Sequence, residues 1–98
     1  MAVLVSVEVP GQTPEGYDAM LQGLEPLIRS APGFICHSAW SDDGTWRVIE
    51  LWESNLAATD FFARHVHPNL PPGIRPRRQL HELHSCVLPA RPDPPSDR

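Results

Sequence analysis

The sequence predicts an α+β domain whose elements follow in the order β-α-β-β-α-β, the ferredoxin-like split arrangement. Segments with a two-residue alternation of apolar side chains are typical of strands, and two other segments have the three-to-four-residue spacing of amphipathic helices. An Asp-Asp-Gly turn at 42–44 joins the second and third strands as an antiparallel hairpin. Right-handed crossovers then place the antiparallel strands in the spatial order 4-1-3-2, with both helices on one face of the sheet.

The first strand and the first helix have clear boundaries. Residues 2–9 form a strand with valines at positions 3, 5, 7 and 9 on one face. Pro10 and Gly11 end this strand. Thr13 and Pro14 then supply an N-cap and a proline at the first helical position. The helix that follows begins its apolar stripe at Tyr17 and stops at Ala-Pro-Gly, positions 31–33.

The middle of the chain pairs a strand with a second helix. Residues 34–41 form the second strand, and residues 46–52 form the third. One face of the third strand carries Trp46, Val48, Glu50 and Trp52. After Ser54, a candidate N-cap, the spacing changes to a helical stripe. That stripe consists of Ala58, Phe61, Phe62, His65 and Asn69.

The last third of the chain is rich in proline. Four prolines lie between positions 68 and 76, which predicts a stiff loop that can form the rim or lid of a pocket. Residues 79–88 alternate as a fourth strand. Residues 89–98 combine proline and charge with nothing to bury, so we expect a disordered tail after a domain spanning residues 1–88.

Composition limits the classes of partner. The 98 residues carry a net charge of −4 and contain no lysine, which argues against nucleic acid. The short basic run of Arg75, Arg77 and Arg78 predicts a solvated loop, with contact to an anionic group of a ligand as the alternative. No segment has the length of a membrane span or the pattern of a signal peptide, so we expect a cytoplasmic protein.

The predicted sheet leaves one face uncovered. That face is partly apolar in strands one and three, which favours a homodimer joined through the two sheets. The same strand order places Cys36 and Cys86 at opposite edges of the sheet, too far apart for a disulfide within one subunit. Both thiols are therefore expected to be reduced.

The element order, Ala-Pro-Gly-Phe at 31–34 and Ile-Glu-Leu-Trp-Glu-Ser at 49–54 resemble the dimeric α/β-barrel superfamily, most closely domains of the antibiotic-biosynthesis-monooxygenase type. The resemblance covers about residues 2–88. It implies a homodimer with a small pocket between sheet and helices in each subunit. It also implies a function among cofactor-free oxygenases of polyketide phenols and quinols, heme-degrading enzymes, isomerases and proteins without known activity.

The heme-degrading branch makes specific demands on this chain. Trp52 matches a tryptophan that lies beside the porphyrin in that branch, and His65 or His67 would have to bind the iron. That branch also uses an asparagine in the first strand, where this chain has valines and Ser6. The sequence therefore favours a protein that needs no cofactor over a heme enzyme.

The candidate site combines an acid with histidines and aromatic side chains. We expect Glu50, Trp52 and His65 to converge between the third strand and the second helix. Glu50 on a covered face needs a partner, and a histidine is the natural one. His65 is either a general base or a helix-end histidine hydrogen-bonded to a carbonyl. The further candidate ligand contacts are Phe61, Phe62, Trp40, His37 and Tyr17.

Two functions follow from this site. The first is a cofactor-independent enzyme that removes a proton from a hydrophobic aromatic or polyketide-like metabolite before oxygenation, cyclisation or isomerisation. The catalytic residues would then be His65 and Glu50. The second is a dimeric binder of small ligands without catalysis. The histidine spacings do not favour a metal site, because His81 and His84 point to opposite faces of a strand.

Overall fold

The computed structural model describes residues 1–90, so residues 91–98 of the predicted tail lie outside the described part. The predicted element order is confirmed. The elements are β1 (Val3–Val9), α1 (Pro14–Arg29), β2 (Phe34–Asp42), β3 (Thr45–Trp52), α2 (Asn55–Phe61) and β4 (Arg77–Glu82). Two short turns follow α2 directly: a π-helical turn, η1 (Phe62–Val66), and a 3-10 turn, η2 (His67–Asn69).

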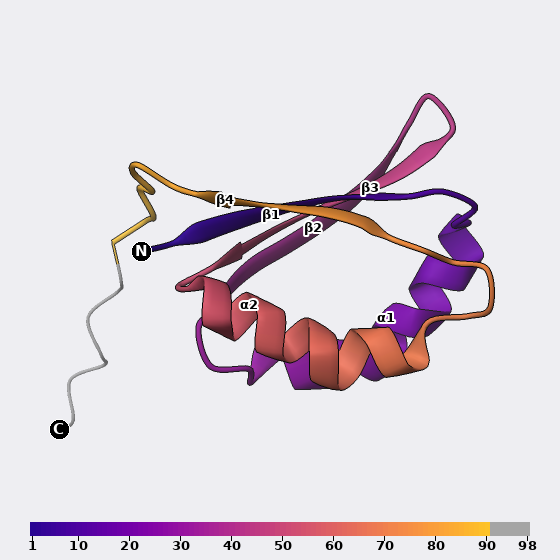
Figure 1. Cartoon of the computed structure of the whole chain (residues 1–98), viewed down its shortest axis with the longest axis horizontal. Coiled ribbons are helices and arrows are strands. Elements are labelled where there is room, and N and C mark those ends of the chain that lie inside the picture. The colour runs from indigo at the N-terminus through magenta and orange to yellow at the C-terminus, as the bar shows by residue number, and fades with distance from the viewer. Residues whose placement is uncertain (91–98) are drawn as a thin grey trace, which may run out of the picture.

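The four strands form one antiparallel sheet in the order β2-β3-β1-β4, which confirms the predicted topology. Both helices lie on the same side of this sheet, and the β2–β3 hairpin projects past them (Figure 1). The structure is therefore two layers, with the opposite face of the sheet uncovered in the single chain. The site described below lies between the two layers.

The core forms where the valine face of β1 meets the helices. Its buried residues come from β1, α1, β3 and α2, and they are Val3, Val5, Ile28, Trp52, Ala58 and Phe61. The Trp52 ring is fully buried, with the rings of Phe34 and Phe61 each 5.4 Å away between centroids. Edge-on and tilted aromatic packing of this kind adds to the hydrophobic free energy of burial.

The β2–β3 hairpin turns on two residues in left-handed conformations. Asp43 has φ 52° and Gly44 has φ 79°. A two-residue turn with positive φ at both positions matches the right-handed twist of the adjoining strands, and Asp-Gly is a favoured pair for it. The predicted hairpin is confirmed, and its register pairs His37 with Glu50.

A bulge near the start of β2 decides which side chains face the helices. The register shifts between Phe34 and Cys36, so Ile35 is an extra residue in this strand. A bulge exchanges the two faces for every residue beyond it. Phe34 packs on the core, and after the bulge His37 faces the helices while Trp40 faces outward.

The second helix differs from the regular helix predicted by the stripe of residues 58–69. The α-helical part ends at Phe61, and the amide of His67 then bonds to the carbonyl of Phe62, five residues earlier. A π-helical turn holds more residues per turn than an α-helix, so it rotates the side chains that follow. Phe62 and Val66 consequently line the pocket, whereas His65 does not.

The predicted boundaries of the fourth strand, 79–88, are wrong. β4 begins at Arg77 and ends at Glu82, where it pairs with Val3 at the start of β1. The amide of Leu83 makes one more bond, to the carbonyl of Ala2, and the following residues have no strand to pair with. Val87 is 94% exposed as a result. The prediction continues the two-residue alternation over 84–88, which is why the predicted strand extends too far.

Cys36 lies on β2, Cys86 lies beyond β4, and both thiols are free and exposed. Within residues 1–90, neither helix combines the length and the apolar character needed to cross a bilayer.

Candidate functional site

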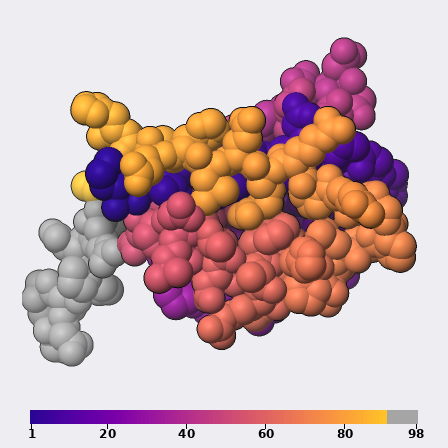
Figure 2. All heavy atoms as spheres, viewed as in Figure 1, coloured from indigo at the N-terminus to yellow at the C-terminus, as the bar shows by residue number. Residues whose placement is uncertain are grey.

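A pocket of about 80 Å³ lies between the sheet and the helices. Its walls come from all four strands, both helices, η1 and the loop at 70–76, and they are mostly apolar. The segment from α2 through this loop packs beneath β4 on the face shown in Figure 2. The predicted role of the proline-rich loop as a rim agrees with Leu70, Ile74 and Pro76 in the pocket wall.

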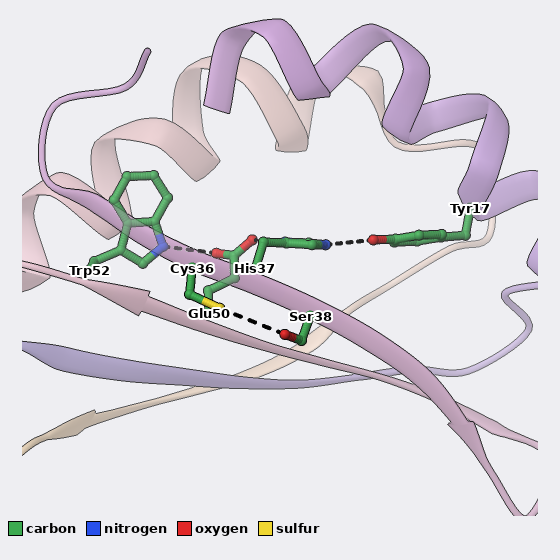
Figure 3. A network of polar contacts seen from close by, with 6 residues as sticks. All are labelled: Tyr17, Cys36, His37, Ser38, Glu50 and Trp52. Atoms are coloured by element: carbon green, nitrogen blue, oxygen red, sulfur yellow. Dashed lines mark hydrogen bonds and ion pairs between the residues drawn. The ribbon is translucent and has the colours of Figure 1, made fainter. Parts of the chain in front are cut away.

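Four side chains form a continuous row of hydrogen bonds along one wall of this pocket (Figure 3). The indole Nε1 of Trp52 donates to Oε1 of Glu50 over 2.9 Å. The other oxygen of Glu50, Oε2, lies 2.7 Å from Nδ1 of His37. The far ring nitrogen of His37, Nε2, lies 2.6 Å from the hydroxyl of Tyr17. The row therefore begins in the core and ends at a phenol in the pocket wall.

The donors and acceptors of the row are mutually consistent. An ionised carboxylate only accepts hydrogen bonds, so Nδ1 of His37 carries a hydrogen and donates to Glu50. In the neutral imidazole Nε2 is then the acceptor, and the hydroxyl of Tyr17 donates to it. A base oriented by a carboxylate, with a hydroxyl on its other nitrogen, is the arrangement used to move protons in many hydrolases.

Burial and charge act on the phenol at the end of the row. Tyr17 is buried, and this burial is the main cause that raises its pKa above the ordinary value. The negative charges of Glu50 and then Asp18 raise the pKa further. A raised pKa keeps the hydroxyl protonated, so Tyr17 acts as a hydrogen-bond donor and proton carrier rather than as a standing phenolate.

Secondary structure explains how these residues meet. Glu50 and Trp52 are two positions apart on β3 and therefore share a face. His37 lies directly opposite Glu50 across the hairpin, and the β2 bulge turns it toward the helices. Tyr17 is held in the first turn of α1, where Thr13 caps the helix through a 3.0 Å bond from the Gly16 amide. The expectation that Glu50 pairs with a histidine is confirmed, and the histidine is His37.

Arg78 occupies another wall of the pocket. Its guanidinium carbon lies 3.9 Å from the centroid of the Phe62 ring, a cation–π contact. Burial is the main cause that lowers its pKa, and the charge of Glu50 acts in the opposite direction. The prediction that Arg77 and Arg78 lie in a solvated loop is wrong, because both belong to β4. Only the two-residue alternation of a strand beginning at Arg77 could have revealed this position.

The predicted convergence of His65 with Glu50 and Trp52 is wrong. His65 packs beside Phe61, with ring centroids 5.0 Å apart, and lines a separate hollow near Leu27 and Leu56. The π-helical turn is the physical cause, because it interrupts the regular stripe on which the prediction depended. Glu50 and Trp52 do meet, as expected from their shared strand face.

The other predicted contact residues divide into two groups. Tyr17, His37, Phe61 and Phe62 line the pocket. Trp40 does not, because the β2 bulge places it on the outer face of the sheet, 40% exposed. Trp52 is enclosed in the core, where it orients Glu50. It therefore has no surface on which a ligand can stack.

The residues do not fit a bound heme. His65, which would have to bind the iron, does not line the pocket, and His67 is exposed after η1. The pocket volume of about 80 Å³ is also far too small for a porphyrin. Among residues 1–90, no three His, Cys, Asp or Glu side chains are grouped to hold a metal ion.

Comparison with solved structures identifies proteins of the same fold. A cofactor-independent oxygenase, SnoaB from Streptomyces nogalater, is 14% identical with a TM-score of 0.59, covering 88% of this chain and 95% of that one. The ActVA-Orf6 monooxygenase of Streptomyces coelicolor, solved with nanaomycin D, is 19% identical with a TM-score of 0.59, covering 91% and 93%.

The heme-degrader MhuD of Mycobacterium tuberculosis is 18% identical with a TM-score of 0.57, covering 89% of this chain and 99% of that one. No protein-family model matches the sequence, and no curated protein matches it significantly. The resemblance to antibiotic-biosynthesis-monooxygenase domains is thus confirmed for the fold.

Proposed function

We propose that this protein is a cofactor-independent enzyme that removes a proton from a hydrophobic aromatic substrate through Tyr17, His37 and Glu50. The observation that carries the proposal is the unbroken row of hydrogen bonds from the core to the pocket. A purely structural buried polar group needs one or two partners, but this row ends at a hydroxyl in the wall of a cavity. The solved oxygenase and monooxygenase of the same fold support this class of reaction.

The proton moves along the row in one direction. As the acidic proton of the substrate passes to the Tyr17 oxygen, the Tyr17 proton passes to Nε2 of His37. The raised pKa of Tyr17 disfavours a free phenolate, which favours coupling of the two transfers. Glu50 stabilises the resulting imidazolium across 2.7 Å, and Trp52 holds the carboxylate in place.

The deprotonated substrate then reacts with dioxygen. For a phenol with a hydrogen at the reacting ring carbon, one oxygen atom becomes a quinone carbonyl and the other leaves as water. The substrate supplies the electrons for this step, so the chain itself has to provide only the base, the orientation and an apolar cavity. Cyclisation or isomerisation of the deprotonated substrate would begin with the same proton removal.

We further propose that the enzyme is a homodimer joined through the outer faces of the two sheets. Both helices cover the same face, which leaves the side chains of Leu4, Ile49, Leu51 and Trp40 on the other. Apolar side chains left uncovered on the sheet of a small domain favour association.

The first prediction tests the base. His37→Ala should reduce turnover by about 10²–10⁴-fold, the usual loss for a general base, because the row then lacks its proton acceptor. His65→Ala is the matched control, since it removes a histidine outside the pocket and should retain activity. The measurement is exchange of carbon-bound substrate hydrogen for deuterium without air, followed by dioxygen uptake, over a panel of enolisable aromatic ketones and phenols.

The two readouts separate the possible outcomes. Exchange without dioxygen uptake would favour isomerisation or cyclisation over oxygenation. Binding with no exchange for any member of the panel would favour the ligand-binding protein instead. Loss of activity in His65→Ala with full activity in His37→Ala would overturn the assignment.

A further inference from the structure

We infer that Arg78 makes the pocket selective for substrates carrying an anionic group, such as a carboxylate, on the side opposite the reacting atom. This inference rests on the proposed function for the identity of the reacting side, but not for the binding preference itself. Its basis is the position, surroundings and free hydrogen-bonding capacity of one guanidinium.

Arg78 lies across the sheet from His37, the base of the proton-transfer row. His37 lies on one edge strand, β2, and Arg78 lies on the other, β4. Three strand spacings put their backbones ~14 Å apart. Their long side chains, together with Tyr17, reach into the same cavity. A ligand held in this cavity can therefore lie between them.

The guanidinium has hydrogen-bonding capacity left over. Within residues 1–90 it makes no hydrogen bond or ion pair, and its contact is the face of Phe62. A guanidinium has five N–H donors, and stacking on a ring leaves the donors at its edge free. The carboxylate of Glu50 also lines the pocket, but His37 and Trp52 hold both of its oxygens, so an entering anion meets Arg78 as a free cationic partner.

The neighbouring arginines show that this position is distinct. Arg75 and Arg77 are exposed, and Arg77 points away from the helices because adjacent strand residues face opposite sides. Arg78 faces inward, and its partner in the ladder is Val7, which also lines the pocket. The basic run therefore contributes one cation to the cavity, while Arg77 offers a control with the same charge.

The experiment compares two probes of nearly equal shape. Calorimetry would measure binding of 4-hydroxybenzoate, which is anionic, and 4-hydroxybenzamide, which is neutral. A charge-assisted contact predicts that the wild-type protein binds the acid about tenfold more tightly than the amide. Arg78→Gln should bring this ratio close to one, Arg78→Lys should retain part of it, and Arg77→Gln should leave it unchanged.

Each outcome tests whether Arg78 causes the preference for anionic ligands. Equal affinity of the wild-type protein for the two probes, no detectable binding of the acid at millimolar concentration, or an unchanged ratio in Arg78→Gln would overturn the inference. Thermal unfolding of each variant measures the stability lost with the cation–π contact, so that this loss is not mistaken for weaker ligand binding. His37→Ala should keep the preference for the acid while losing proton exchange, so failure of the catalytic proposal is distinguishable from failure of this one.

Discussion

Tyr17 is the only tyrosine in the chain, so the phenol at the end of the hydrogen-bonded row can be titrated directly. Its hydroxyl is enclosed by the pocket wall and donates to a histidine that is itself held by a carboxylate. Few sites allow the ionisation of one functional group to be followed without labelling. The pKa of this phenol consequently reports the electrostatics of the whole row.

The second prediction concerns this titration. The ultraviolet absorbance of the phenolate should give a midpoint above the ordinary ~10, because burial and then Glu50 raise the pKa. Glu50→Gln should lower the midpoint more than Asp18→Asn does, since Glu50 has the larger influence of the two carboxylates. A midpoint at or below the ordinary value in the wild-type protein would contradict the described geometry.

The raised pKa of Tyr17 also makes the free energy of unfolding depend on pH. Below pH ~10 the phenol is protonated in both the folded and unfolded chains, so its contribution is fully present. As pH rises toward the higher folded pKa, the unfolded chain releases its proton first and the folded state loses free energy relative to it. The difference in unfolding free energy between the wild-type protein and Tyr17→Phe should therefore shrink above that pH in urea denaturation.

At the scale of elements, Gly33 fixes how the start of β2 approaches α2. It has φ 82°, and a Cβ atom placed on it would lie 2.9 Å from the Cβ of Ala57. Its carbonyl also accepts a 2.7 Å bond from the amide of Glu53, at the end of β3. The left-handed backbone and the close approach of α2 both require glycine here.

The third prediction uses two glycines with opposite surroundings. Gly33→Ala should destabilise the protein by about 2 kcal/mol, because it adds a clash to a backbone conformation that alanine rarely adopts. Gly23→Ala should stabilise it by roughly 0.5–1 kcal/mol, because Gly23 lies inside α1 with no atom within 4 Å of the new methyl group. Urea denaturation of the two variants measures both, and equal effects would show that α2 does not press on Gly33.

The order of the elements could be predicted from the sequence, but the direction in which some side chains face could not. Alternation and capping residues predicted the order of strands and helices, because both depend on neighbours within a few positions. The bulge at Ile35 and the π-helical turn at Phe62–Val66 each change the facing of later residues, and neither has a local sequence pattern. The candidate site therefore lost His65 and Trp40 and gained His37 as the partner of Glu50.

At the scale of the whole molecule, the main feature is the sheet face that the helices of the single chain leave uncovered. Leu4, Ile49 and Leu51 lie on this face, in the paired strands β1 and β3. Sequence alone predicted this face, since apolar residues occupy both sides of the third strand.

The fourth prediction addresses this association. Light scattering should give the mass of a dimer at micromolar concentration, and Ile49→Arg should give a monomer, because two copies would then bring like charges together on an apolar face. Leu56→Arg is the control, since Leu56 is 79% exposed on the helical side of the molecule. A monomeric wild-type protein, or a dimer in Ile49→Arg, would rule out pairing through the sheets.

The three tryptophans lie in three different surroundings. Trp40 is on the outer sheet face, Trp46 lines the pocket with its ring 4.9 Å from that of Tyr17, and Trp52 is fully buried. Variants that retain one indole at a time would turn the chain into three emission probes. The emission wavelength of Trp40 would report subunit pairing, and quenching of Trp46 would report a bound ligand. The emission of Trp52 would stay constant until the core unfolds.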